Sequence, residues 1–253
     1  MPMPPTRGNL PLAFGLWFHF WLVPITIIGG TLTILFSFLD RGGWMLHRIA
    51  RWWGQALVSL GRLTVQVEGV ENLVPGQTYV FAANHRSNFD IYLLLAFLPS
   101  DIAFVAKKSL FNIPLFGQAI YRMGCVPVDR ENIQQAVRSL NQAAARVKEG
   151  NSIAIFPEGT RTLSPTLIPF KKGVFIMAQR SGQPVVPVSI NGTRFIQPRG
   201  TIKVQPGPVK LIIHPPLFPQ NYRRKEGLMA AVHESMAAGY DPDFPYGPGG
   251  PHV

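Results

Sequence analysis

The segment Asn84-His85-Arg86-Ser87-Asn88-Phe89-Asp90 is the strongest candidate for acid–base chemistry in this chain. A histidine whose ring is held by a carboxylate at one nitrogen can take a proton from an alcohol at the other. Residues five apart on a regular helix differ by roughly 140° in direction. His85 and Asp90 can therefore meet only if the chain turns between them, with Ser87 or Asn88 as the helix N-cap. Taken alone, the pair more often marks a histidine hydrogen-bonded near a helix start.

A second polar segment, Phe156-Pro157-Glu158-Gly159-Thr160-Arg161, follows the apolar run Ser152–Ile155. Proline and glycine force a turn there, which aims Glu158 and Arg161 out of the edge of a sheet. The planar guanidinium of Arg161 is suited to binding phosphate. The alternative is a solvated turn with a surface ion pair.

Two further segments are weaker signals by themselves. The stretch Gly124–Arg130 is an apolar run that ends in Asp129-Arg130, and these two side chains could simply pair at the surface. The run Val186–Ile190 indicates only a buried strand.

Cys125, the one cysteine, has apolar neighbours, which favours a small core side chain over a nucleophile. A single cysteine also excludes an internal disulfide.

Together and in this order, the four segments resemble the motifs of the glycerol-phosphate and lysophosphatidic acid acyltransferase family. Those motifs are Asn-His-x-x-x-x-Asp, Gly-x-x-x-x-x-Arg, Phe-Pro-Glu-Gly-Thr-Arg and Val-Pro-Val-x-Ile. The stretch Ala106–Gly117 is also similar to the family, and the resemblance covers residues 63–215. Thr162 stands where many members carry serine, and both residues have a hydroxyl group.

The resemblance implies a role for each matching residue. His85 would be the general base on the acceptor hydroxyl, and Asp90 would orient it. The acceptor's phosphate would be held by three cations: Lys107, Arg130 and Arg161. Four more positions would complete the site. Glu158 would help to bind the acceptor, by orienting Arg161 or contacting its glycerol. The Gly159–Thr160 backbone would form part of an oxyanion site, and Pro187 would shape the strand beside the acyl chain.

The reaction implied is transfer of a fatty acyl group from acyl-CoA or an acyl carrier protein to the sn-2 hydroxyl of lysophosphatidic acid. The thioester is a co-substrate, so no cofactor and no metal are expected, and the six histidines show no ligand spacing with cysteine. Alternatives are another lyso-lipid acceptor, transfer between two phospholipids, a hydrolase, and a non-enzymatic basic binding protein. The sequence has no Gly-x-Ser-x-Gly elbow, which argues against a serine hydrolase.

The composition favours a membrane over nucleic acid as the partner. The formal charge is +11, which calls for an anionic partner. Only 15% of the residues are charged and 47% are apolar, an unusual balance for a nucleic-acid binder. We therefore expect an anionic membrane surface, an anionic lipid acceptor and an anionic acyl donor as partners, and no nucleic acid.

The N-terminal part predicts a membrane-association module over residues 1–62. Residues 8–39 lack Asp, Glu, Lys and Arg, and a helix of that length exceeds a bilayer core. Pro24 and Gly29-Gly30 interrupt it, so it is either one tilted or kinked span or a re-entrant pair of half-helices. The run is too long for a secretory signal peptide, and no cleavage site stands out. Most nearby Lys and Arg follow residue 40, which places the globular part on the cytoplasmic side of the inner membrane.

The next segment predicts an amphipathic helix with a basic stripe. Its polar side is a series spaced by seven residues: Arg41, Arg48, Gln55 and Arg62. A face rich in tryptophan covers the rest, which suits a helix that lies on anionic headgroups. The alternative is an ordinary helix packed on the globular core.

From residue 63 onward, short apolar runs alternate with helical patterns. The predicted strands are 64–68, 79–83, 102–106, 126–128, 152–156, 185–190, 202–204 and 209–213, and the clearest helices are 91–97, 132–148 and 174–180. This alternation predicts an α/β domain over residues 63–239, with a mixed, largely parallel sheet flanked by helices. The Gly- and Pro-rich residues 240–253 predict a disordered tail.

Overall fold

A computed structural model describes residues 12–40 and 43–246 of the chain. Arg41, the first four residues of the uncharged N-terminal run and the last seven of the predicted tail lie outside the described residues. Seven strands form one sheet: β1 (Leu63–Glu68), β2 (Val80–Ala83), β3 (Ile102–Lys107), β4 (Val126–Val128), β5 (Ser152–Ile155), β6 (Val185–Asn191) and β7 (Gly207–Ile213).

The sheet has the strand order β1-β7-β6-β2-β5-β3-β4. All neighbouring pairs are parallel except β6 and β7, which are antiparallel. In the central pairs, Ala82 of β2 lies opposite Ile155 of β5 on one side and Pro187 of β6 on the other. Strands β2, β5 and β6 are buried along their whole length, as expected of strands covered on both faces. The predicted mixed, largely parallel sheet is confirmed.

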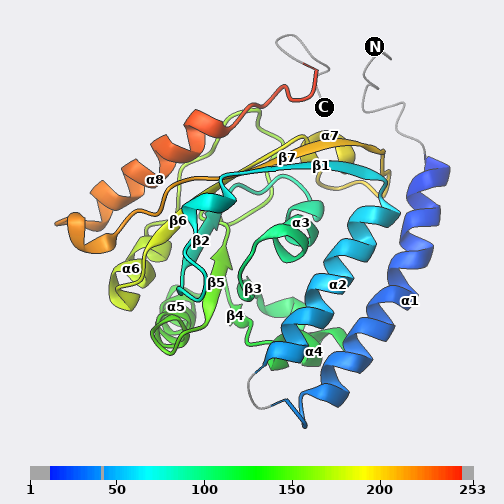
Figure 1. The fold of residues 1–253 in the computed structure, drawn as a ribbon, viewed down its shortest axis with the longest axis horizontal. Helices are drawn as coiled ribbons and strands as arrows, with labels where there is room; N and C mark the ends of the chain where they lie inside the picture. The colour runs from blue at the N-terminus through cyan, green and yellow to red at the C-terminus, as the bar shows by residue number, and fades with distance from the viewer. Residues whose placement is uncertain (1–11, 41–42, 247–253) are drawn as a thin grey trace.

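Helices cover both faces of the sheet (Figure 1). On one side lie α5, α6 and α8, and on the other lie α3, α2 and α1, with α2 between α3 and α1. The α-helices are α1 (Leu12–Phe36), α2 (Trp44–Leu60), α3 (Phe89–Phe97), α4 (Phe116–Arg122), α5 (Ile133–Lys148), α6 (Lys172–Ser181), α7 (Thr193–Ile196) and α8 (Lys225–Gly239). The described residues also form the short 3₁₀ helices η2 (Val70–Asn72), η3 (Lys108–Asn112) and η4 (Pro219–Asn221).

The N-terminal helix α1 is continuous through Pro24 and the Gly29-Gly30 pair. Of the two alternatives, a re-entrant pair of half-helices does not fit this continuous helix, and a single helix is observed. A side chain at Gly29 would press on Trp53 of α2, and one at Gly30 would lie 3.1 Å from Leu115. The two glycines thus let α1 approach α2 and the residue that precedes α4, rather than breaking the helix.

Helix α2 uses most of its apolar face for packing on α3. Its buried residues are Leu46, Ala50, Gly54, Leu57 and Val58. Trp53 donates from Nε1 to Thr26 Oγ1 of α1 at 3.1 Å and packs edge-on against Tyr92 of α3. The face expected on lipid headgroups is therefore mostly an interface with the domain, which was the alternative interpretation. Trp44 and Trp52 remain exposed.

Two predictions about irregular segments are wrong. Residues Ile202–Val204 form no strand, because their backbone lies against α1, where any side chain at Gly15 would collide with Ile202. The predicted disordered tail is ordered from Tyr240 to Tyr246, where turns pack on the domain. Tyr246 packs edge-on against Phe195 at 5.1 Å and accepts a hydrogen bond from Gln205. Specific side-chain partners override the Gly- and Pro-rich composition there.

Candidate active site

The predicted site residues lie at one edge of the sheet, where four parallel strands end side by side. His85 follows β2, Glu158 follows β5, Lys107 is the last residue of β3 and Arg130 follows β4. These strands are consecutive in the sheet order β2-β5-β3-β4. The carboxyl edge of parallel strands is where open α/β sheets hold their ligands.

Asn84 fixes the end of β2 to β6. Its side-chain Nδ2 donates to Ile190 O at 2.9 Å, and its Oδ1 accepts from Ile190 N at 2.7 Å. Both residues are buried, so the amide replaces a pair of backbone hydrogen bonds as the strands end. The residue before His85 is thereby held in place, although sequence reasoning assigned Asn84 no role of its own.

His85 and Asp90 meet as the spacing argument predicted. Asp90 lies in the first turn of α3, and its Oδ2 is 2.8 Å from His85 Nδ1. The same oxygen accepts from the backbone amides of Arg86 at 2.6 Å and Ser87 at 2.8 Å. Asp90 therefore caps the turn that returns it to the imidazole. Asn88 occupies the N-cap position, but its side chain makes no capping bond.

The geometry prepares the free nitrogen of His85 to accept a proton. A carboxylate can only accept hydrogen bonds, so Nδ1 carries a hydrogen, and in the neutral imidazole the lone pair is on Nε2. Phe156 stacks on the imidazole, with 3.8 Å between the ring centroids and 11° between the planes. His85 is 8% exposed and Asp90 is fully buried, so the histidine and not the carboxylate reaches the surface.

Glu158 forms a buried ion pair with Arg86, not with Arg161. Arg86 Nη1 is 2.7 Å from Oε2 and 2.9 Å from Oε1, and Oε1 also accepts from the backbone amide of His85 at 3.2 Å. Glu158 is fully buried and Arg86 is 1% exposed. Glu158 therefore does not orient Arg161 directly, because its oxygens are engaged behind the histidine. Its predicted contact with the glycerol stays a prediction.

Arg161 and Arg130 are two cations whose charges influence each other, and neither pairs with a carboxylate among the described residues. Arg161 donates from Nη1 to Asn88 Oδ1 at 2.9 Å, which ties it to the turn before α3. Desolvation, and then repulsion by Arg161, lower the pKa of Arg130, although arginine stays charged. Within the described residues, neither guanidinium has an ion-pair partner. Such a pair favours an anionic ligand.

Lys107 lies beside these cations on the strand between them. It is exposed and stands opposite Val128 of β4 in the sheet register. The adjacent Lys108 takes the carboxylate of Asp129, with Nζ 3.5 Å from Oδ2. Asp129 therefore does not neutralise Arg130, which was the alternative interpretation of the Asp-Arg pair.

Three other predicted positions have less direct support. Gly159 has a φ of 73°, which favours glycine, and its amide donates to Phe156 O at 3.0 Å. That amide is therefore not free to bind an oxyanion. The Thr160 amide has no hydrogen bond to any described residue. Pro187 is buried in β6, and its carbonyl accepts from His214 N at 3.0 Å, so its predicted place beside an acyl chain stays a prediction.

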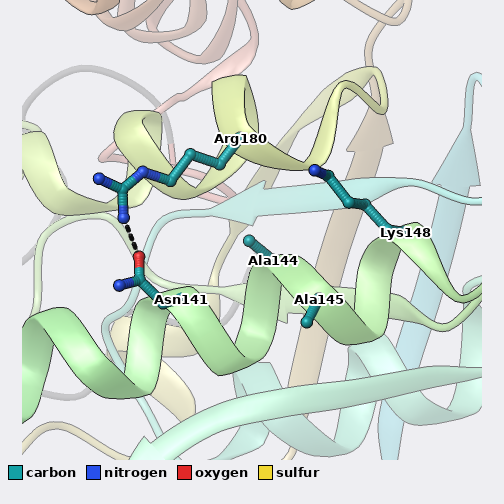
Figure 2. Close-up of a pocket in the computed structure, with 5 residues that line it drawn as sticks. All are labelled: Asn141, Ala144, Ala145, Lys148 and Arg180. Carbon is teal, nitrogen blue, oxygen red and sulfur yellow. Dashed lines mark hydrogen bonds between the residues drawn. The ribbon is translucent and has the colours of Figure 1, made fainter.

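Two other features of the described residues concern possible metal ligands and a hollow between two helices. No group of three or more His, Cys, Asp or Glu side chains there could hold a metal ion. A hollow of about 260 Å³ lies between α5 and α6, where Arg180 donates to Asn141 and Lys148 lines the rim (Figure 2). It contains none of the predicted site residues.

Comparison with known proteins places this arrangement in a family. Residues 64–191, which hold all four motifs, match the model of the family described as Acyltransferase. This chain belongs to that acyltransferase family. The resemblance drawn from the motifs is therefore confirmed, and the histidine–aspartate pair and the cationic edge lie within the matched region.

A solved acyltransferase structure has the same fold over nearly its whole length. The crystal structure of the 1-acyl-sn-glycerophosphate (LPA) acyltransferase PlsC from Thermotoga maritima matches with a TM-score of 0.80 and 32% identity. The match covers 90% of this chain and 93% of that one. The similarity thus extends beyond the motifs to the N-terminal helices.

Curated relatives carry a corresponding name. A chloroplastic 1-acyl-sn-glycerol-3-phosphate acyltransferase of Brassica napus is 37% identical over 199 residues, covering 78% of this chain and 57% of the relative. The 1-acyl-sn-glycerol-3-phosphate acyltransferase of Haemophilus influenzae is 36% identical over 146 residues, covering 57% and 60%. The chain spans little more than half the length of these curated relatives.

Proposed function

We propose that this chain transfers a fatty acyl group from an acyl thioester to the sn-2 hydroxyl of lysophosphatidic acid, which gives phosphatidic acid in phospholipid synthesis. The observation that carries the proposal is the His85–Asp90 pair, with 2.8 Å between Nδ1 and Oδ2, beside the cations Arg161 and Arg130. The names of the relatives in Brassica napus, Haemophilus influenzae and Thermotoga maritima support this acceptor.

The proposed chemistry is direct acyl transfer with His85 as general base. Nε2 takes the proton of the acceptor hydroxyl while its oxygen forms a bond to the thioester carbon. The C–S bond then breaks, the acyl oxygen ester remains, and the thiolate recovers the proton from the imidazolium. Asp90 holds Nδ1–H throughout and stabilises the imidazolium. Because the Gly159 amide is already bonded, the Thr160 amide is the candidate that remains in this turn for binding the oxyanion.

Recognition of the acceptor rests on its phosphomonoester. A phosphate at the end of the glycerol carries close to two negative charges at neutral pH. Arg161 and Arg130 lie at the same sheet edge as His85, and Lys107 lies on the strand between them. A phosphate bound by these three side chains would bring the glycerol hydroxyl toward the imidazole.

The donor is a thioester of coenzyme A or of acyl carrier protein, and the proposed reaction uses no other cofactor. Both donors are anionic, as is a membrane rich in acidic lipids, and the chain's charge of +11 complements all three. Nucleic acid is not a proposed partner. Pro187 remains the proposed neighbour of the acyl chain.

The outer face of α1 supports contact with a membrane. It is the one described helix that is long and apolar enough to span a bilayer, and only 17% of its most apolar stretch is buried. Its exposed large apolar side chains include Leu16, Trp17, Phe20, Val23 and Ile27. We propose that α1 anchors the protein in the inner membrane with the sheet on the cytoplasmic side, so that the acceptor reaches the site from the bilayer.

The acceptor is tested with purified protein in mixed micelles. The acceptors are lysophosphatidic acid and lysophosphatidylcholine of the same acyl chain, and each is assayed with acyl-CoA and with acyl carrier protein thioester. Released thiol and lipid product are followed together. We expect phosphatidic acid, one thiol per lipid formed, and a kcat/KM at least tenfold lower for lysophosphatidylcholine because it lacks the phosphomonoester.

Three outcomes would contradict the proposal. Equal kcat/KM for the two acceptors would point to another lyso-lipid as the natural acceptor. Thiol release without a lipid product would point to a thioesterase. Lipid binding without turnover on any acceptor or donor would favour the non-enzymatic interpretation.

A further inference from the structure

Tyr240 reaches the catalytic motif from the far end of the chain. Its hydroxyl accepts a hydrogen bond from Arg86 Nε at 3.0 Å, across 154 positions in the sequence. The guanidinium of Arg86 also lies over the tyrosine ring, 5.1 Å from its centroid. Burial raises the pKa of Tyr240, so the phenol is neutral at physiological pH and its oxygen remains an acceptor.

Arg86 connects Tyr240 to the backbone of His85. Its Nη1 bonds both oxygens of Glu158 and also His85 O at 3.1 Å, while Nη2 donates to Thr166 O at 3.1 Å. Glu158 in turn accepts from His85 N. The peptide groups on both sides of the His85 α-carbon are therefore bound to one buried ion pair. Arg86 belongs to that ion pair, and its Nε–H donates to the hydroxyl of Tyr240.

The segment that carries Tyr240 is itself fixed to the domain. Asn191, the last residue of β6, donates to Gly239 O at 2.8 Å and accepts from Asp241 N at 3.0 Å. Arg194 of α7 donates to Pro242 O at 3.2 Å. These bonds hold both sides of Tyr240, so the placement of its hydroxyl is determined by β6 and α7 rather than by Arg86 alone.

We propose that Tyr240 is a positioning residue for acyl transfer, which acts through Arg86 and Glu158 to hold the backbone of His85. The inference rests on the proposed function. Without the hydroxyl, a buried Nε–H loses its partner, and the guanidinium loses one of the bonds that fix its orientation. The ion pair that holds the two peptide groups of His85 would then shift, and a displacement of about 1 Å at a catalytic group costs about 10²-fold in rate.

The test compares two tyrosine-to-phenylalanine variants from the same C-terminal segment. Tyr240→Phe keeps the ring over the guanidinium and removes the acceptor of Arg86 Nε. Tyr246→Phe removes a similar hydroxyl, which accepts from Gln205 Nε2 at 3.2 Å, with no contact to Arg86. For Tyr240→Phe we expect kcat to fall by about tenfold or more, with KM for both substrates within about twofold. Tyr246→Phe should retain a kcat within about twofold of wild type.

The split between kcat and KM separates positioning from a general loss of structure. An unchanged kcat for Tyr240→Phe, or an equal loss for Tyr246→Phe, would overturn the inference. If the wild-type protein transfers no acyl group, the proposed function fails, and the ring proton at His85 Nδ1 then decides the inference. This proton is assigned in NMR spectra by its loss in His85→Ala. It should shift in Tyr240→Phe alone, and an unchanged signal would overturn the inference.

Discussion

Glu158 and Arg86 form a fully buried ion pair, with 2.7 Å between Oε2 and Nη1, directly behind the backbone of His85. The glutamate of the Phe-Pro-Glu-Gly-Thr-Arg segment is therefore fully buried and does not reach the surface at which a substrate is proposed to bind. Asp90 fixes the imidazole through Nδ1, and Glu158 fixes the His85 amide. Two carboxylates thus hold the same histidine, one by its ring and one by its backbone.

Removing the charge of Glu158 should destabilise the fold. In Glu158→Gln, the buried guanidinium of Arg86 loses its counter-charge, which typically costs about 3–5 kcal/mol of unfolding free energy. The matched control is Glu68→Gln, because Glu68 pairs with Lys210 at 2.9 Å at the surface, where such a pair contributes less than about 1 kcal/mol. Denaturant unfolding measures both. Equal losses for the two variants would contradict a special role for the buried pair.

Replacing Arg161 and Arg130, which have no ion-pair partner among the described residues, should weaken binding of the acceptor. Arg161→Gln and Arg130→Gln each remove a charge from the proposed phosphate site, so we expect KM for lysophosphatidic acid to rise by about tenfold or more. Arg223→Gln is the control, because Arg223 is exposed in the segment between η4 and α8, which holds none of the predicted site residues. Initial rates over a range of acceptor concentration give KM, and unchanged values for both site variants would refute the phosphate assignment.

The sequence predicts the parts of this site that depend on local spacing. The turn that returns Asp90 to His85 follows from the five-residue separation, and the alternation of strands and helices places both at the end of β2. Arg86 occupies a variable position of the motif, and its partner Glu158 is 72 positions away. Nothing in the local pattern marks a buried arginine, so its pairing with the glutamate could not be predicted.

The C-terminal segment shows where a prediction from composition alone fails. Glycine and proline predict disorder when no partner is known, but Tyr240 is held by Arg86 and Tyr246 packs on Phe195. Similarly, Ile202–Val204 has the composition of a strand, and contact with α1 decides its shape. These outcomes depend on contacts between distant parts of the chain. Helix α8 is not predicted by its sequence, which carries only a weak amphipathic pattern.

Cys125 should be unreactive in the folded protein. Burial raises the pKa of its thiol to about 11, so the nucleophilic thiolate is scarce at neutral pH and the sulfur is inaccessible. We expect native protein at pH 8 to resist a thiol reagent that labels urea-unfolded protein at one site per chain. Cys125→Ala should keep full acyl transfer. Rapid native labelling, or loss of activity in that variant, would reopen a nucleophilic role for the cysteine.

The outward face of α1 should govern membrane attachment. Phe20 and Ile27 are two turns apart on that face and are 69% and 51% exposed. A double variant that carries Phe20→Asp and Ile27→Asp should therefore greatly reduce sedimentation with phospholipid vesicles. The control is Ile133→Asp on α5, an apolar residue that is 81% exposed on a different helix. We expect that variant to sediment like wild type. Equal loss by both variants, or by neither, would refute attachment through α1.

The central claim is that His85 is the base that activates the hydroxyl of lysophosphatidic acid. The most direct measurement is single-turnover transfer of a labelled acyl chain from its thioester to lysophosphatidic acid, by wild type, His85→Ala and Asp90→Asn. The account predicts labelled phosphatidic acid from wild type and a rate lower by about 10²–10⁴-fold in both variants, with unchanged acceptor binding. Phosphatidic acid formed by His85→Ala at the wild-type rate, or an acyl group left covalently on the protein, would contradict it.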